Sequence, residues 1–150
     1  MIDKQRLRDQ LKKHEGVRRH VYDDASGKLI DEACFVRGKP TIGVGRNLAD
    51  RGLDETEIDF LLDNDINDCI AEAQKFRWFE ALDPVRQAAV TELIFNLGLT
   101  RLSGFKKFLN FMNEHRYAQA AAELMDSKWA QQVRGRAVTI SNMVKTGEWT

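Results

Sequence analysis

The sequence predicts an α+β protein in which a small antiparallel sheet lies among helices, and three observations support this. Short β-prone runs, separated by glycine and proline, fall between residues 17 and 46. Residues 54–75 carry apolar side chains at helical spacing. Residues 76–150 fit several further helices, the most apolar of which stops at Gly98. A chain of 150 residues suits one domain, or two small lobes that share a helix.

The composition is that of an ordinary globular protein, with 43% hydrophobic and 31% charged residues. The 23 basic and 23 acidic residues cancel, which argues against general nucleic-acid binding, because that function requires a basic excess. Residues 51–75 carry two basic and eight acidic side chains, so the rest of the chain is net positive. A basic face would suit an anionic polymer, and it is equally an ordinary solvated surface.

The first predicted helix covers residues 3–14, with Asp3 as its N-cap and leucines at i, i+4. Glu15 follows at its C-terminal end, where Gly16 offers the left-handed turn that closes helices. The negative end of the helix dipole disfavours the ionised form of a carboxylate at this place. Glu15 therefore suits the role of a general acid, which must keep its proton near neutral pH.

A second carboxylate, Asp24, lies in the Gly/Ser-rich turn of residues 23–27, where it should be better solvated and ionised. Two carboxyl groups that differ in this way form the arrangement that cleaves glycosidic bonds. A plainer interpretation fits the same residues, in which Glu15 is a surface residue and Asp24 only builds its turn.

Residues 17–46 predict a three-stranded antiparallel sheet. Its β-prone runs are residues 21–22, 29–30, 34–36 and 41–44. A sheet this small is stable only when it packs against other elements, which here are the helices.

A long helix should follow the sheet, because Asp54 and Glu57 have the spacing of a capping box. We expect this helix to run to about Lys75. Asp83 and Pro84 should begin the next helix, which ends at Gly98 and forms the centre of the helical region.

Three more helices are expected, from residues 103–104, over 117–126, and from about 135 to 146. Trp78 and Phe79 should be buried before them, and Trp149 should pack back onto the last one.

The two cysteines, Cys34 and Cys69, are expected to be unpaired thiols in a reducing compartment. Residues 1–6 contain no apolar leader, and no apolar run is long enough to span a bilayer. We therefore expect a soluble protein made in the cytosol. The three histidines lack metal-ligand spacing, and the sequence contains no phosphate loop or zinc motif.

An ordered set of short motifs runs along nearly the whole chain. It consists of Glu15-Gly16, Asp24, Thr41-Ile-Gly-Val-Gly45, Leu82-Asp-Pro-Val-Arg86, Phe95-Asn-Leu-Gly98, Ser103-Gly-Phe105, Ser127-Lys-Trp129, Arg136-Ala137 and Thr146-Gly-Glu-Trp149. Each motif is weak by itself, but their order resembles the phage-type lysozymes (endolysins) of glycoside hydrolase family 24, the T4 lysozyme kind.

The resemblance implies a single lysozyme-like domain over residues 1–150. A β lobe would cover about residues 15–50, a linking helix about 54–75, and a helical lobe about 76–150 together with the N-terminal helix. The implied enzyme is a muramidase, which hydrolyses the β-1,4 bond between N-acetylmuramic acid and N-acetylglucosamine in bacterial peptidoglycan.

By the same resemblance, Glu15 protonates the leaving oxygen, while Asp24 and Thr41 direct water to the anomeric carbon. Inversion of configuration, which the family implies, requires the two carboxyl groups to lie roughly 6.5–9.5 Å apart. Substrate would also contact Asn47, Phe95 and Asn96, although a phenylalanine at a helix end is more often a core residue. Two alternatives stay open, a lytic transglycosylase and a non-catalytic peptidoglycan-binding protein on the same fold.

The implied protein needs no metal or cofactor, acts as a monomer, and inserts into no membrane. It would wait in the host cytoplasm until a separate holin permeabilises the membrane, then reach the wall and lyse the cell.

The sequence departs from the family's pattern between Asp24 and Thr41, where a short turn is replaced by residues 25–40. The extra segment, roughly residues 29–40, should form a longer hairpin that returns Thr41 to the site. Arg46 stands where several family members have histidine, and we expect it to pair with Asp65.

Overall fold

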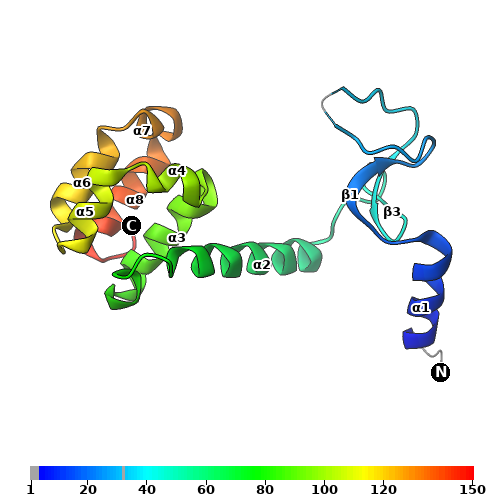
Figure 1. Cartoon of the computed structure of the whole chain (residues 1–150), viewed down its shortest axis with the longest axis horizontal. Coiled ribbons are helices and arrows are strands. Elements are labelled where there is room, and N and C mark those ends of the chain that lie inside the picture. Colours follow the sequence, from blue (N-terminus) through cyan, green and yellow to red (C-terminus); the bar gives the residue numbers. More distant parts are fainter. Residues whose placement is uncertain (1–3, 32) are drawn as a thin grey trace. The chain divides into compact units, whose positions relative to one another are not determined.

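The computed structural model of the chain describes residues 4–31 and 33–150, without the side chain of Leu7 (Figure 1). The chain divides into two compact units, residues 1–58 and 59–150. Helices and one small sheet make up the structure, as the predicted α+β class requires. The expected N-cap, Asp3, lies outside the described residues.

The first unit contains one helix and the whole sheet. Its elements are α1 (Lys4–Glu15), β1 (Arg18–Asp23), β2 (Pro40–Gly43) and β3 (Arg46–Asn47). The strands are antiparallel in the order β1-β2-β3, which confirms the predicted three-stranded sheet. Thr41 lies in the central strand, opposite Tyr22 on one side and Asn47 on the other.

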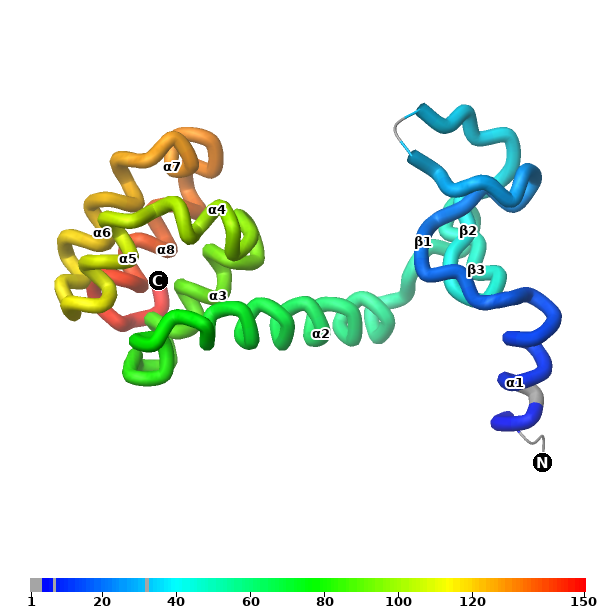
Figure 2. Tube along the Cα trace, in the orientation of Figure 1, coloured from blue at the N-terminus to red at the C-terminus, as the bar shows by residue number. Residues whose placement is uncertain are grey.

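The segment between β1 and β2, residues 24–39, differs from its prediction. The runs at residues 29–30 and 34–36 do not form strands of the sheet. Leu29 makes a single antiparallel bridge to Tyr22, and the described residues beyond it form a loop that returns to β2 (Figure 2). The expected long hairpin is therefore wrong beyond residue 30. The reason is that the main-chain N–H groups of Arg37 and Gly38 donate to the Asp23 carboxylate, and so they do not form the ladder of a strand.

Helix α2 (Glu55–Ala73) begins with the predicted capping box. The Glu57 N–H donates to Asp54 Oδ1 and the Asp54 N–H donates to Glu57 Oε2, each at 2.9 Å. These bonds satisfy N–H groups that the first helical turn would otherwise leave unpaired. The helix ends two residues before Lys75.

The second unit is helical. It contains the rest of α2, η1 (Phe79–Ala81), α3 (Pro84–Leu97), α4 (Leu99–Ser103), α5 (Lys106–Asn113), α6 (Tyr117–Met125), α7 (Lys128–Val133) and α8 (Gly135–Thr146). Helix α3 starts at Asp83, whose carboxylate accepts from the N–H groups of Val85 and Arg86, and it ends before Gly98, as predicted. Helix α7 was not predicted; the Ser127 hydroxyl caps it by accepting from the Ala130 N–H.

The hydrophobic core belongs to the helical unit. Every buried hydrophobic residue that the structure describes lies between residues 73 and 144, and Val90 and Leu93 of α3 are fully buried. Trp78 and Phe79 are buried as predicted. The prediction for Trp149 is wrong, since it is 71% exposed on the two-residue tail beyond Glu148.

Both cysteines are free thiols, as expected, and Cys69 packs against the core. In the described part of the chain, no helix has the length and apolarity that crossing a membrane requires. That the whole chain forms one domain, with the N-terminal helix in its helical lobe, stays a prediction.

Candidate active site

Glu15 is the last residue of α1, and its carboxyl group lies against the turn between β2 and β3. Gly16 ends the helix with φ +74°, and its N–H donates to the Lys12 carbonyl at 3.0 Å. A Cβ atom placed on Gly45 would lie 3.2 Å from Glu15 Oε2. The fold therefore brings the predicted acid to the Thr-Ile-Gly-Val-Gly motif, 30 positions further along the chain.

Gly45 is required at this contact for two reasons. Its φ of +67° is a conformation that residues with a Cβ atom rarely adopt. A side chain there would also press on the Glu15 carboxyl group. Glycine thus allows the exposed Glu15 to lie close to the main chain of the sheet.

Asp24 is exposed directly after β1, and it is held by the chain that returns to β2. The Lys39 N–H donates to Asp24 Oδ1 at 2.6 Å, and the Asp24 N–H donates to the Lys39 carbonyl at 3.2 Å. Gly38 lies so close that an added Cβ would overlap Asp24 Oδ1. The orientation of this carboxylate therefore depends on residues 38 and 39.

Thr41 is 4% exposed in the central strand, and its hydroxyl donates to the Lys39 carbonyl at 2.9 Å. The Lys39 main chain thus contacts both Asp24 and Thr41. Because the hydroxyl proton of Thr41 is used in this bond, the oxygen can offer only lone pairs to a further partner. The structure thus links these two predicted site residues through one shared partner, the main chain of Lys39.

Asp23, which sequence reasoning had treated only as part of a turn, is fully buried beside them. Its Oδ1 accepts from the N–H groups of Ala25 at 3.0 Å and Gly38 at 2.8 Å. Its Oδ2 accepts from the Ser26 hydroxyl at 2.9 Å and the Arg37 N–H at 3.0 Å. The Arg37 N–H is the largest cause that lowers the pKa of Asp23 to about 2, and burial opposes it.

Asn47, a predicted substrate contact, lies in β3 opposite Thr41. Its Nδ2 donates to Asp50 Oδ2 at 2.9 Å, and its Oδ1 accepts from the Asp50 N–H at 3.0 Å. Asp50 also pairs with Lys39 Nζ at 2.9 Å, which lowers the pKa of Asp50 through a direct hydrogen bond. Asn47 is thus half-buried in a local polar group, and its contact with substrate stays a prediction.

The expected pairing of Arg46 with Asp65 needs correction. The guanidinium group of Arg46 pairs with Glu57, and its Nε donates to the Gly52 carbonyl at 3.0 Å. Glu57 is the capping-box residue in the first turn of α2, two helical turns before Asp65. The pair joins the end of the sheet to the start of α2.

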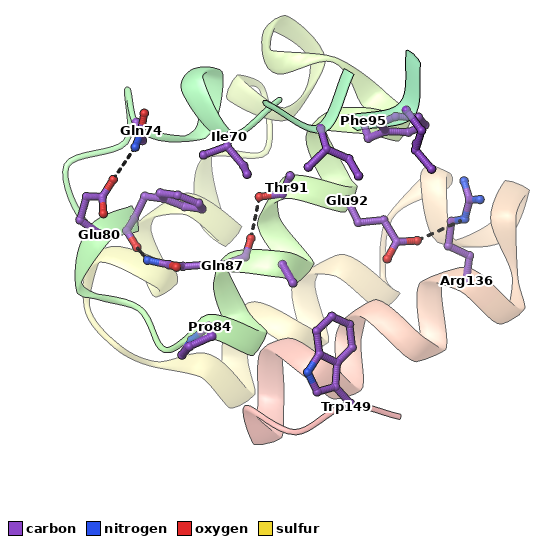
Figure 3. Close-up of a pocket in the computed structure, with 14 residues that line it drawn as sticks. Ile70, Gln74, Glu80, Pro84, Gln87, Thr91, Glu92, Phe95, Arg136 and Trp149 are labelled. Carbon is purple, nitrogen blue, oxygen red and sulfur yellow. Dashed lines mark hydrogen bonds and ion pairs between the residues drawn. The ribbon is translucent and has the colours of Figure 1, made fainter. Parts of the chain in front are cut away.

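Phe95 and Asn96 lie at the end of α3 in the helical unit. Phe95 is 48% exposed and lines a largely apolar cavity of about 570 Å³, near the Glu92–Arg136 ion pair of 3.6 Å (Figure 3). Asn96 Oδ1 accepts from the indole N–H of the buried Trp129 at 2.7 Å. Both roles in substrate binding stay predictions, and Asn96 has a structural role as well.

No group of three or more His, Cys, Asp or Glu side chains is placed to hold a metal ion within residues 4–31 and 33–150. The described site offers carboxyl, hydroxyl and main-chain groups, which are the groups of acid–base chemistry.

Comparison with known proteins identifies the family. The sequence profile described as "Phage lysozyme" matches residues 12–144, a range that includes Glu15, Asp24 and Thr41. The chain belongs to the phage lysozyme family. Two relatives of this chain come from Dictyostelium discoideum: "Probable T4-type lysozyme 2" is 26% identical and "Probable T4-type lysozyme 1" is 23% identical. Each match covers 94% of this chain and 94% of the relative. The α+β fold is therefore lysozyme-like, and family membership supports a glycosidase-type enzyme.

Proposed function

We propose that this member of the phage lysozyme family is a muramidase, which hydrolyses the β-1,4 bond between N-acetylmuramic acid and N-acetylglucosamine in peptidoglycan. The main support is the placement of Glu15 at the glycine turn, in the same unit as the linked pair Asp24 and Thr41.

In this mechanism the Glu15 carboxylic acid protonates the glycosidic oxygen as the bond breaks. Asp24 uses Oδ1 to bind the Lys39 N–H, and Oδ2 takes a proton from the attacking water. The Thr41 oxygen accepts a second hydrogen bond from that water and so orients it. Water attack on the face opposite the leaving group inverts the anomeric centre, and we expect a carboxyl separation of roughly 6.5–9.5 Å.

We further propose that the enzyme acts as a monomer and without a cofactor, and that it lyses bacteria as an endolysin. It would wait in the host cytoplasm and reach the wall after a holin has permeabilised the membrane.

The decisive experiment measures the turbidity of permeabilised Gram-negative cells with the parent protein and with Glu15→Gln, and analyses the products by mass spectrometry. We expect the parent to release reducing muramyl ends and the folded variant to be inactive. Full lysis by the variant would refute the role of Glu15. Anhydro-muramyl ends would indicate a transglycosylase, and binding to sacculi without lysis would indicate a non-catalytic binding protein.

A further inference from the structure

Residues 25–40 are called the insert, because the family resemblance implies a short turn in their place. They lie between Asp24 and Thr41, the proposed water-directing pair. The insert starts at the turn after Asp23 and rejoins β2 at Pro40. Residues 37–39, which directly precede β2, are called the returning end. Two of them, Gly38 and Lys39, lie against the Asp24 carboxylate, so a shift of the returning end would move it.

One buried side chain fastens both ends of the insert. The Asp23 Oδ1 atom accepts one N–H from the first residue, Ala25, and one from Gly38 at the returning end. Oδ2 accepts from the Ser26 hydroxyl near the start of the insert and from the Arg37 N–H at the returning end. The carboxylate is fully buried, so water cannot readily replace a lost partner. The partners from the returning end lie 14 and 15 positions away, and local turn formation does not explain them.

The peptide group of Lys39, the next residue along the chain, connects the returning end to the proposed site residues Asp24 and Thr41. Lys39 follows Gly38, and its N–H and carbonyl bond to Asp24 while its carbonyl also accepts from Thr41. Asp23 itself forms the last pair of the β1–β2 ladder, opposite Pro40. The returning end is thus fixed by two interactions: its N–H groups bond to the Asp23 carboxylate, and the residue that follows it, Pro40, pairs with Asp23 in the sheet.

We propose that Asp23 is a positioning residue of the active site: its buried carboxylate fixes the returning end of the insert, and thereby the Lys39 peptide that orients Asp24. The proposal rests on the proposed function, because Asp24 must direct water for its orientation to matter. Asp23 contacts neither substrate nor water in this role.

The test compares Asp23→Asn with the parent. An asparagine amide accepts at one oxygen only, so one pair of bonds to the insert is lost while the volume is kept. We expect kcat on peptidoglycan chains to fall about 10-fold to 100-fold and KM to change less than about two-fold, because orientation is lost and binding is not. The Lys39 N–H should exchange faster with deuterium.

Asp31→Asn is the matched control in the same insert. The exposed Asp31 accepts from the Ala33 N–H at 3.0 Å and is not one of the groups that bind residues 37–39. We expect its kcat, KM and Lys39 exchange to equal those of the parent. Gly38→Ala is a second variant, which keeps Asp23 but presses a methyl group on Asp24 Oδ1, and its kcat should also fall.

A folded Asp23→Asn variant with parental kcat, or with parental Lys39 exchange, would overturn the proposal. Should that variant not fold, Gly38→Ala decides, and a parental kcat in it would overturn the proposal. The amide exchange needs no substrate, so it tests the positioning even if Glu15→Gln shows that the proposed function is wrong.

Discussion

At the scale of single residues, the absence of a side chain at Gly45 allows the Glu15 carboxyl group to lie against the turn between β2 and β3. A substitution at Gly45 tests this contact. Gly45→Ala places a methyl group 3.2 Å from Glu15 Oε2 and forces alanine to φ +67°. We expect a stability loss of about 1–2 kcal/mol from the backbone conformation. The displaced carboxyl group should also lower kcat about 10-fold or more.

Gly52→Ala separates the two effects of the Gly45 substitution. Gly52 has a similar φ of +62°, and a Cβ atom there meets nothing within 4 Å. Urea unfolding should show a comparable loss of unfolding free energy in both variants, whereas kcat should fall only in Gly45→Ala. Equal activities in the two variants would contradict the close contact of Glu15 with the turn.

The acid stability of the protein should depend on Asp23. Its folded-state pKa is lowered from 3.8 to about 2, mainly by the Arg37 N–H. The ionised carboxylate therefore stabilises the fold above pH 4, and this contribution is lost as the pH falls from about 4 to about 2. Urea unfolding at several pH values should show a weaker dependence for Asp23→Asn than for the parent in this window. Parallel curves would contradict the prediction.

The roles of single residues could be predicted where they depend on neighbouring residues or on a motif, and less well where they depend on distant parts of the chain. Gly16 marks the helix end after Glu15, as a glycine at that place indicates. Asp23 was missed because its partners at the returning end follow only from the path of the insert. Arg46 was given the wrong partner because helical counting does not reveal that Glu57 already faces the sheet.

At the scale of elements, α3 depends on Asp83, the N-cap residue that precedes it. Asp83 caps the helix and also pairs with Arg86 Nη1 at 2.7 Å, while Arg86 donates to the Val144 and Lys145 carbonyls near the end of α8. We expect Asp83→Ala to cost about 1–2 kcal/mol of unfolding free energy, since it removes the cap and the partner of Arg86.

Asp83→Asn is the control for the cap, because asparagine caps helices about as well as aspartate. The unfolding free energy that Asp83→Asn loses, measured by urea unfolding, should be clearly smaller than the loss in Asp83→Ala. If both variants lose the same stability, the charge of Asp83 matters and its capping does not.

Helices were easier to predict than strands for a physical reason. The starts of α2 and α3 are encoded within three residues by Asp54 and Asp83 with their followers. The run at residues 34–36 has strand propensity, but a strand also needs a partner, and the main chain beside it is bound by Asp23.

At the scale of the whole molecule, the two units differ in what holds them together. The helical unit contains every described buried hydrophobic residue, whereas the buried side chains described in the first unit are Asp23 and Thr41. We expect a fragment of residues 54–150, which keeps the α2 cap, to unfold cooperatively, because it has its own core. A fragment of residues 1–53 should not, since a small sheet needs packing to be stable.

Circular dichroism during heating and amide NMR spectra test both fragments. A cooperative transition in residues 1–53, or its absence in residues 54–150, would contradict this expectation. The division of the chain was only partly predictable, because the apolar spacing of α2 indicates a helix but not which of its residues become buried; Leu61 and Leu62 are 46% and 42% exposed.

The closure of the insert by one carboxylate also has a use in protein engineering. Both ends of the insert are hydrogen-bonded to Asp23. Residues added after Cys34 would therefore lengthen the loop without moving its two ends. Each doubling of such a loop costs only about 0.6 kcal/mol in closure entropy. The tip of the insert is therefore a graft point for a peptide tag or a wall-targeting sequence, which would be displayed while the reaction centre keeps its shape.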